Sequence, residues 1–456
     1  MISITGSRIK KVFILTKPTP NPARMLAYDL ISQVNRQGAF ANIRLPELLK
    51  KSNLKSIDRN LTTEICYGTL RMQGYLDYVA GKFTDRIFSD LDPKIQDLLR
   101  MGIYQIVQMR VPDHAAVSET VEVAREVAGD SKASYVNAIL RKVSSSDLDL
   151  SDLDKLSDEE KFSIKYSHPI WIVRAFFDQL KSWDEVEQLL VANNQAIRPD
   201  LVCWPNKSSE SEFLQLGAQK IDGLKNGFTI DEIPSDFKPI IERRAGVQDR
   251  GSQIVVEDFL ATYQPGLKWL DMCAGPGGKA AYLYHSLAAL ESSPKFLANE
   301  PVSHRAELVK RVIGNDLVVS NDARDYKKFT GKFDRILVDA PCTGLGALRR
   351  RPEARWRRKV SDLKELVALQ QSLLESAYLI LQPHGIIAYA TCSPHILETK
   401  AQITNFLADH NDMKLLPIGS LPNANKTGIT ENGTVQLWTH INQSDSMFIA
   451  FLQKID

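Results

Sequence analysis

Residues 336–359 read Ile-Leu-Val-Asp-Ala-Pro-Cys-Thr-Gly-Leu-Gly-Ala-Leu-Arg-Arg-Arg-Pro-Glu-Ala-Arg-Trp-Arg-Arg-Lys. The stretch opens with an apolar run that ends in Asp339 and is followed by Cys342. This order is typical of a buried parallel strand that delivers side chains to the carboxyl edge of a sheet, where open α/β folds bind ligands. A basic segment with one aromatic residue follows, which suits a phosphate backbone and a stacked base. Its members are Arg349, Arg350, Arg351, Arg355, Trp356, Arg357 and Arg358. The stretch predicts an α/β fold and chemistry on a nucleic acid.

The composition is that of an ordinary globular protein with two or three domains. The chain has 456 residues, of which 43% are hydrophobic and 25% charged, and its formal net charge is +2. Affinity for a nucleic acid must therefore come from local clusters of basic side chains. No apolar run approaches the ~20 residues of a membrane span. The apolar core Val12–Leu15 is too short for a signal peptide, so we expect no contact with a membrane.

The cysteines indicate a reducing compartment. There are five of them, an odd number, and no two form a Cys-X-X-Cys pair. We therefore expect neither a disulfide framework nor a zinc site. The sequence predicts a cytoplasmic protein that binds no metal.

Five segments of the chain differ in pattern. Residues 1–22 contain three prolines and are expected to be irregular, whereas residues 23–145 follow helical spacing throughout. Residues 146–161 are rich in serine and acidic side chains, which predicts a solvated linker. A helical stretch and then a small strand-rich connector are expected over residues 162–250. Residues 251–456 alternate between strand and helix patterns, which predicts a mostly parallel sheet with helices on both faces.

Apolar runs bounded by polar residues give the expected strands of this last segment. They are Leu267–Asp271, Lys295–Glu300, Leu317–Ser320, Arg335–Asp339 and Ile386–Thr391, with Thr434–Thr439 and Met447–Gln453 in the tail. Helices are expected to begin near Gly278, Ser303, Ser361 and Pro394.

A glycine-rich turn follows the first of these strands. Its residues are Cys273, Ala274, Gly275, Pro276, Gly277, Gly278 and Lys279. Glycines let a ligand approach the backbone closely, and the helix that follows offers free N–H groups. A P-loop is excluded because Ala280 stands where that motif needs Ser or Thr. Asp271, Glu300 and Asp322 stand at successive strand ends. This arrangement suits a nucleoside cofactor, although a tight turn without a ligand is the alternative interpretation.

Two thiols follow strands at the same expected edge of the sheet, Cys342 and Cys392. Ser393 and Pro394 suit the cap and first position of a helix. A cysteine near a helix N-terminus favours the thiolate, which is the nucleophilic form. The commoner fate of a lone thiol is burial in a core, and we assign it to Cys66 and Cys203.

Two thiols and an acid suit methylation at carbon 5 of a pyrimidine. Addition of a thiolate at C6 makes C5 nucleophilic, so that C5 can accept an electrophilic methyl group. A base must then remove the C5 proton, and the thiol must be expelled. Asp339 is placed to bond ring N3 and the exocyclic amine, provided that the target base is unpaired or flipped.

Three motifs of the sequence resemble those of the RNA (cytosine-5) methyltransferases that use S-adenosylmethionine. In chain order they are Cys273–Lys279, Asp339–Cys342 and Thr391–Ser393. The resemblance implies a Rossmann-like class I methyltransferase domain. It implies that the glycine turn, Glu300, Asp322 and Asp339 line the cofactor site. It also implies that Cys392 attacks C6 and that Cys342 assists proton removal and product release. DNA cytosine methyltransferases, which use the Pro-Cys thiol as nucleophile, and amino-methyltransferases, which carry Pro-Pro-aromatic there, are disfavoured.

The N-terminal half carries a second resemblance. Segments 114–124 and 135–142 look like the all-helical NusB-type RNA-binding fold. Segments 167–169, 192–194 and 247–253 resemble the bacterial 16S rRNA methyltransferase B (RsmB/Sun/Fmu) subgroup of the NOL1/NOP2/Sun family. This implies 16S rRNA as the partner, and we expect a monomer. Gly275 and Ala280 stand where many members have Ala and Thr, and neither difference removes a proposed contact group.

Other interpretations stay open. The target could be tRNA or 23S rRNA within the same enzyme class. In a different class, the chain would be a non-catalytic RNA-binding or antitermination-like protein that kept the fold. Both thiols and the glycine turn are present, which favours the enzyme.

Overall fold

A computed structural model describes residues 19–109 and 111–455 of the chain. Two compact units are present, Met1–Asp149 and Leu150–Asp456, and each has its own buried apolar side chains. The irregular stretch expected over residues 1–22 lies, up to residue 18, outside the described residues. None of the helices in the described ranges is both long and apolar enough to cross a membrane.

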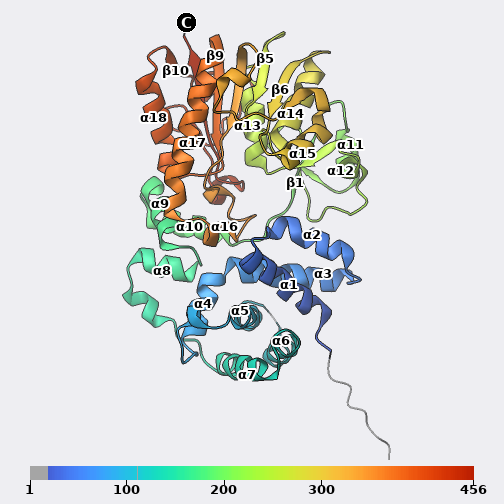
Figure 1. The fold of residues 1–456 in the computed structure, drawn as a ribbon, viewed down its shortest axis with the longest axis vertical. Helices are drawn as coiled ribbons and strands as arrows, with labels where there is room; N and C mark the ends of the chain where they lie inside the picture. Colours follow the sequence, from blue (N-terminus) through green and yellow to red (C-terminus); the bar gives the residue numbers. More distant parts are fainter. Residues whose placement is uncertain (1–18, 110, 456) are drawn as a thin grey trace, which may run out of the picture. The chain divides into compact units, whose positions relative to one another are not determined.

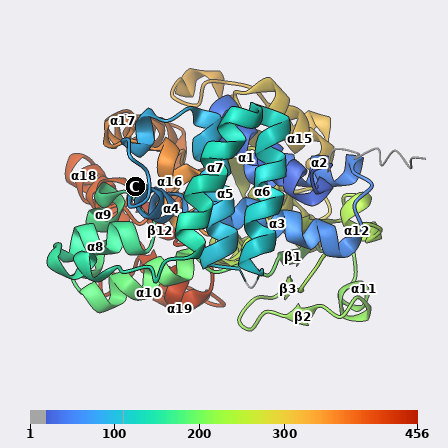
Figure 2. The ribbon, with the colours of Figure 1, turned by 90° about the horizontal axis from the view of Figure 1, so that it is seen from below.

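The first unit is made of helices, as the sequence predicts. They are α1 (Pro22–Gln37), α2 (Ala41–Lys51), α3 (Ser56–Arg71), α4 (Gln73–Gly81), a 3-10 turn (Phe88–Asp90), α5 (Pro93–Val107), α6 (Asp113–Ala128) and α7 (Asp130–Ser144). Helix α5 lies at the centre, because Leu98, Leu99 and Ile103 are fully buried and the helix packs against α1, α3, α4, α6 and α7. Asp92 caps the first turn of α5. Pro93, which has no N–H, occupies the first position, where an N–H would have no partner within the helix. Figure 2 shows α5, α6 and α7 side by side.

The second unit begins with a helical group. It consists of a 3-10 turn (Ser151–Lys155), α8 (Asp158–Lys165), α9 (Ile170–Leu180) and α10 (Trp183–Asn193). The predicted linker 146–161 is therefore wrong in part, since Leu153 is buried and α8 begins inside the segment. Ser157 and Glu160 form a capping box at its start. The acidic residues that suggest a solvated linker are the first turn of a helix, where the helix dipole favours negative charge.

A small antiparallel sheet follows, in the segment where the sequence predicts a strand-rich connector. Its strands are β1 (Asp200–Cys203), β2 (Gln219–Lys220), β3 (Gly227–Thr229) and β4 (Ala245–Val247), in the order β2-β3-β1-β4. Two short helices lie between the strands, α11 (Glu210–Gln215) and α12 (Lys238–Ile241). Phe213 of α11 stacks on Phe228 of β3 with ring centroids 4.8 Å apart and so closes one face of the sheet.

The main sheet is mostly parallel, as predicted. Its strands are β5 (Lys268–Asp271), β6 (Lys295–Asn299), β7 (Val318–Val319), β8 (Phe333–Asp339), β9 (Leu381–Thr391), β10 (Met413–Leu415), β11 (Val435–Gln436) and β12 (Phe448–Lys454). The order is β10-β12-β9-β8-β5-β6-β7, with β11 beside β12. Strands β5 to β9 run parallel, while β12 runs antiparallel to β9 and β10. The chain proceeds outward from β5 to β7 and then returns to place β8 on the other side of β5. The carboxyl ends of β5 and β8 are therefore a topological switch point, where such sheets bind ligands.

Helices cover both faces of this sheet (Figure 1). They are α13 (Arg250–Leu260), α14 (Gly278–Leu290), α15 (Ser303–Ile313), α17 (Val360–Leu379) and α18 (Lys400–Asp409). Two short helices, α16 (Ala354–Arg357) and α19 (Thr439–Asn442), lie instead beside the helical group 150–194. Trp269 and Leu337 belong to the core under α13, α14 and α15, whereas Leu270 and Ile336 belong to the core under α17 and α18. Neighbouring strand residues thus enter opposite cores, so these strands are apolar on both sides.

Three details of the main sheet differ from the prediction. Strand β10 was not expected, because three residues with a lysine in the middle give little apolar signal. The tail strand expected over Thr434–Thr439 is only Val435–Gln436. No α-helix begins at Pro394; a 3-10 turn covers Ile396–Glu398 and α18 begins at Lys400. Ser393 is therefore no helix cap, and its hydroxyl has another role, described below.

Candidate active site

The glycine turn connects β5 to α14 at the switch point. Gly277 adopts φ +114° as the N-terminal cap of α14, a conformation that only glycine takes without strain. A Cβ atom here would also lie 3.3 Å from the Val309 Cα of α15. The turn therefore packs closely on the neighbouring helix. The first N–H groups of a helix have no partner within it, so the start of α14 suits a polar or anionic ligand.

Two buried side chains at this turn carry polar atoms that have no hydrogen-bond partner among the described residues. Asp271 is fully buried, and while its Oδ1 accepts from the Cys273 N–H at 3.3 Å, its Oδ2 has no partner. Burial, with the charge of Asp339, raises the pKa of Asp271 to about 7. Both amide atoms of Gln248 are likewise without a partner, and this side chain lies 3.8 Å from the Cβ position of Gly278. Buried polar atoms are normally bonded, so the turn fits a ligand with its own donors and acceptors, as S-adenosylmethionine has.

The acids of the next two strands lie at the same edge. Glu300 directly follows β6 and is 2% exposed; its Oε1 accepts from the Val302 N–H at 2.9 Å, and its Oε2 lies 3.3 Å from Arg305. Its carboxylate lies over the glycine turn, because a Cβ on Gly275 would be 1.9 Å from Glu300 Oε2. Asp322 follows β7 and is half exposed, paired with Arg324. The glycine turn, Glu300 and Asp322 thus follow β5, β6 and β7, and the remaining residue of the predicted cofactor site, Asp339, ends β8.

The two thiols predicted as catalytic lie against each other. The Sγ atoms of Cys342 and Cys392 are 3.4 Å apart, because they follow the adjacent parallel strands β8 and β9. The hydrogen bond from the Cys342 thiol lowers the pKa of Cys392, and the same hydrogen bond, with burial, raises the pKa of Cys342. The third thiol at this edge, Cys273, has a pKa well above the ordinary value because it is buried among acids. Cys392 is therefore the thiol of the three that most readily ionises.

Asp339 lies next to the thiols and is held by a lysine of the glycine turn. Lys279 Nζ is 2.8 Å from Asp339 Oδ2, and Asp339 is the last residue of β8. The ammonium of Lys279 also acts on the charge of Cys392. This ion pair thus links the glycine turn to Asp339, the acid that lies next to the two thiols.

One residue that the sequence analysis missed is Glu398, in the 3-10 turn after β9. Its buried carboxylate accepts from the Thr343 N–H at 2.8 Å and from the Ser393 hydroxyl at 2.6 Å. These two partners each follow one of the thiols in the sequence. The sequence does show an acid six residues after Cys392, but no neighbouring residue indicates that the Glu398 side chain points into the protein.

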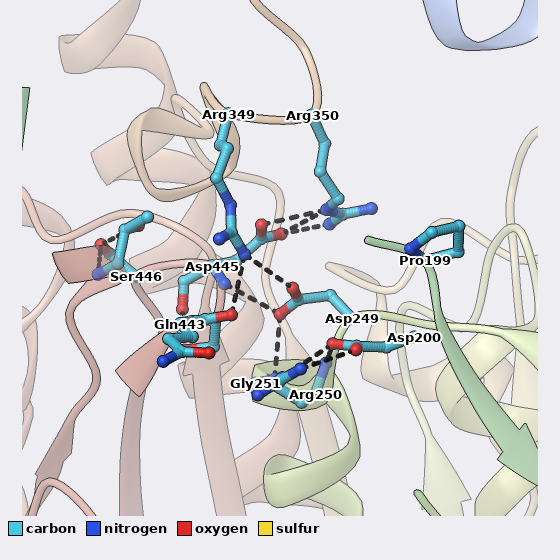
Figure 3. A network of polar contacts seen from close by, with 12 residues as sticks. Pro199, Asp200, Asp249, Arg250, Gly251, Arg349, Arg350, Gln443, Asp445 and Ser446 are labelled. Carbon is cyan, nitrogen blue, oxygen red and sulfur yellow. Dashed lines mark hydrogen bonds and ion pairs between the residues drawn. The ribbon is translucent and has the colours of Figure 1, made fainter. Parts of the chain in front are cut away.

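The arginines of the basic segment do not all face solvent (Figure 3). Arg349 is buried and donates to the Gln443 carbonyl at 2.8 Å, with Asp249 4.0 Å away. Arg350 donates to the buried carboxylate of Asp445, with Nε 3.0 Å from Oδ1. Asp249 in turn accepts from the Asp445 N–H at 2.9 Å. Burial and these bonds speak against the predicted RNA contact of Arg349, whereas Arg350, although bonded to Asp445, keeps 34% of its side chain exposed.

Arg355 departs furthest from the prediction. It is fully buried, and its Nη1 donates to the Ser167 carbonyl at 3.1 Å and to Asn194 Oδ1 at 2.9 Å. It therefore joins α16 to the helical group 150–194. Arg351 is exposed, whereas the other three members of the predicted RNA contact are partly exposed, Trp356, Arg357 and Arg358. Among residues 19–109 and 111–455, no group of three or more His, Cys, Asp or Glu is placed to hold a metal ion.

Comparison with known proteins agrees with this geometry. Residues 259–453 match the family described as 16S rRNA methyltransferase RsmB/F, and residues 21–145 match the NusB family. A Mycobacterium tuberculosis protein named as a methyltransferase is 36% identical over 95% of this chain and 97% of its own length. Ribosomal RNA small subunit methyltransferase B of Yersinia enterocolitica is 32% identical over 87% of this chain and 92% of its own length. The crystal structure of PH0851 superposes with a TM-score of 0.79 at 23% identity, over 96% of this chain and all of that one.

The fold and the matching families are those of an RNA methyltransferase that depends on S-adenosylmethionine. Within that class, the chain belongs to the RsmB/F 16S rRNA methyltransferase family and carries a NusB-family domain before the methyltransferase domain.

Proposed function

We propose that the enzyme methylates carbon 5 of a cytosine in 16S rRNA through a covalent bond between Cys392 and C6. The observation that carries this proposal is the pair of thiols 3.4 Å apart beside an aspartate at the switch point. Methylation at an exocyclic amine would need no second thiol, because that nitrogen needs no covalent activation.

Cys392 is the nucleophile. The pKa of Cys392 is lowered by the hydrogen bond from Cys342, which favours the nucleophilic thiolate. The thiolate adds to C6, and the electron pair of the C5–C6 double bond moves toward C5. The carboxylate of Asp339 accepts a hydrogen bond from the exocyclic amine of the base, and its ion pair with Lys279 fixes the position of this carboxylate.

The cofactor residues are those of the turn and the strand ends. The free Oδ2 of Asp271, the amide of Gln248 and the N–H groups of α14 supply acceptors and donors for its amino-acid part. Glu300 and Asp322 are placed for the nucleoside part. When bound, S-adenosylmethionine supplies the electrophilic methyl group.

Cys342 assists release. In the free protein the pKa of Cys342 is raised first by its hydrogen bond to Cys392, and this cause disappears once the Cys392 sulfur is bound to C6. The Cys342 proton then leaves for solvent, and the resulting thiolate takes the C5 proton. The electron pair of the C5–H bond re-forms the C5–C6 double bond, and the pair of the C6–S bond returns to Cys392.

RNA contact is proposed for the part of the basic segment that solvent can reach. This is Arg351, with the partly exposed side chains Arg350, Trp356, Arg357 and Arg358. The NusB-family domain supports an RNA partner, and the named relative from Yersinia enterocolitica supports 16S rRNA.

The test is methyl transfer from methyl-labelled S-adenosylmethionine to transcribed 16S rRNA, 23S rRNA and tRNA. We expect label in 16S rRNA, at a cytosine that bisulfite sequencing identifies, and none with Cys392→Ala. Label confined to 23S rRNA or tRNA would refute the target. Absence of label from all three RNAs would favour the non-catalytic RNA-binding protein.

A further inference from the structure

The buried carboxylate of Glu398 connects the two segments that carry the thiols. Oε1 accepts from the Thr343 N–H at 2.8 Å and from Gln370 Nε2 at 3.0 Å. Oε2 accepts from the Thr343 hydroxyl at 2.5 Å and from the Ser393 hydroxyl at 2.6 Å. Glu398 has no exposed surface, so each bond is made in a medium where losing it costs more than in water.

These bonds lie beyond the end of the sheet ladder, beside a bond from the Gly346 N–H to the Cys392 carbonyl, 2.9 Å, and a contact between the Thr343 and Ser393 hydroxyls, 3.0 Å. The ladder between β8 and β9 ends with the bond from the Ala340 N–H to the Ala390 carbonyl, 2.9 Å. Beyond it, Thr343 directly follows Cys342 and Ser393 directly follows Cys392. One carboxylate bonded to both residues therefore limits how far the two sulfurs can separate.

We propose that Glu398 is a positioning residue that holds Cys342 in place against Cys392 and thereby serves product release more than addition. Addition needs the Cys392 thiolate, which the charge of Lys279 favours even without the hydrogen bond from Cys342, whereas release needs the Cys342 sulfur itself at the C5 proton while Cys392 is still bound to C6. Loss of the link therefore acts mainly on the second step. This inference rests on the proposed function, which gives the thiols these separate roles.

The test compares Glu398→Ala, which removes all four bonds, with Glu398→Gln. The glutamine has the same length, and its amide can donate to the hydroxyls of Thr343 and Ser393, which turn to accept. The matched control is Glu257→Ala, because Glu257 is also buried and hydrogen bonded, to Tyr282 at 2.5 Å, but lies on α13. Each variant is mixed with 16S rRNA and labelled S-adenosylmethionine for one turnover. The RNA-protein adduct and the released methylated RNA are then measured on a denaturing gel.

We expect Glu398→Ala to slow release by up to about 100-fold, the effect of misplacing a reacting group by about 1 Å, and to accumulate a ribonuclease-sensitive adduct. Glu398→Gln should stay within about tenfold of the unmodified protein, and the control should not accumulate adduct. Equal slowing of addition and release in Glu398→Ala, or no slowing, would overturn the proposal. If Glu398→Ala does not fold, Ser393→Ala should give the same change to a smaller degree, and an unchanged release rate in it would overturn the proposal instead.

A second measurement separates this inference from the proposed function. Oxidised glutathione converts two neighbouring thiols to a disulfide and is itself reduced, and mass spectrometry gives the fraction of protein with Cys342 joined to Cys392. No RNA is needed. We expect Glu398→Ala to form this disulfide more slowly than the unmodified protein and Glu257→Ala to form it equally fast. An unchanged rate in Glu398→Ala would refute the positioning role, whereas a slowed rate without any adduct from any variant would refute the proposed chemistry alone.

Discussion

Replacing Arg355 with methionine should destabilise the unit Leu150–Asp456 without acting on RNA directly. Methionine keeps an unbranched apolar stem but removes the guanidinium, so that the buried Ser167 carbonyl and the partly buried Asn194 Oδ1 each lose the hydrogen bond from Arg355. An unpaired buried acceptor costs about 1–2 kcal/mol, so the loss in the free energy of unfolding should be about 2–4 kcal/mol. At an m-value of about 3 kcal/mol/M, this lowers the urea midpoint by roughly 1 M.

The assay is urea unfolding followed by tryptophan fluorescence, with Arg351→Gln as the matched control. Arg351 is exposed, so this variant should keep its stability within about 0.5 kcal/mol. It should instead weaken RNA binding and lower the slope of log affinity against log salt by about 0.7–0.9, the loss of one phosphate contact. The reasoning would be refuted if Arg355→Met kept the midpoint of the unmodified protein and showed the flatter salt dependence itself.

Two further changes test the packing around the site. Burial raises the pKa of Asp258 to about 7 from 3.8, so between these values the folded protein binds a proton that the unfolded chain has lost, and stability falls as pH rises. Asp258→Asn keeps the bond from the Asn425 N–H, 2.6 Å, and should make the urea midpoint less dependent on pH between 5 and 8, whereas an unchanged dependence would contradict the assignment. Gly346→Ala would place a Cβ 2.0 Å from the Ser446 carbonyl oxygen and 2.9 Å from that of Cys392. It should cost about 1–3 kcal/mol in unfolding experiments and reduce methyl transfer, and a fully active, equally stable variant would show that the segment can move.

Sequence patterns predicted the architecture well where the signal is local. Buried parallel strands need apolar residues on both faces, so the runs that end at Asp271 and Asp339 were recognisable from composition alone. Because parallel strands share one carboxyl edge, their end residues come together, as Lys279 and Asp339 do. The thiols at the ends of β8 and β9 meet for the same reason.

Partners distant in sequence could not be predicted. The basic segment suggested an RNA surface because six arginines follow one another closely. Asp249 and Asp445, which occupy Arg349 and Arg350, lie about a hundred residues away in either direction. Charge patterns give no information on which acids the fold brings near. The inward turn of Glu398 escaped prediction because its partners Thr343 and Gln370 belong to other elements.

Trapping the covalent intermediate with Cys342→Ala tests the central claim most directly. The variant is expressed in cells and run on a denaturing gel with and without ribonuclease, and RNA from any slower band is sequenced. The account predicts a ribonuclease-sensitive band that carries 16S rRNA and vanishes when Cys392→Ala is added. Methyl transfer by Cys342→Ala with no such band would show that Cys342 is not needed for release, and would contradict the roles assigned to the two thiols.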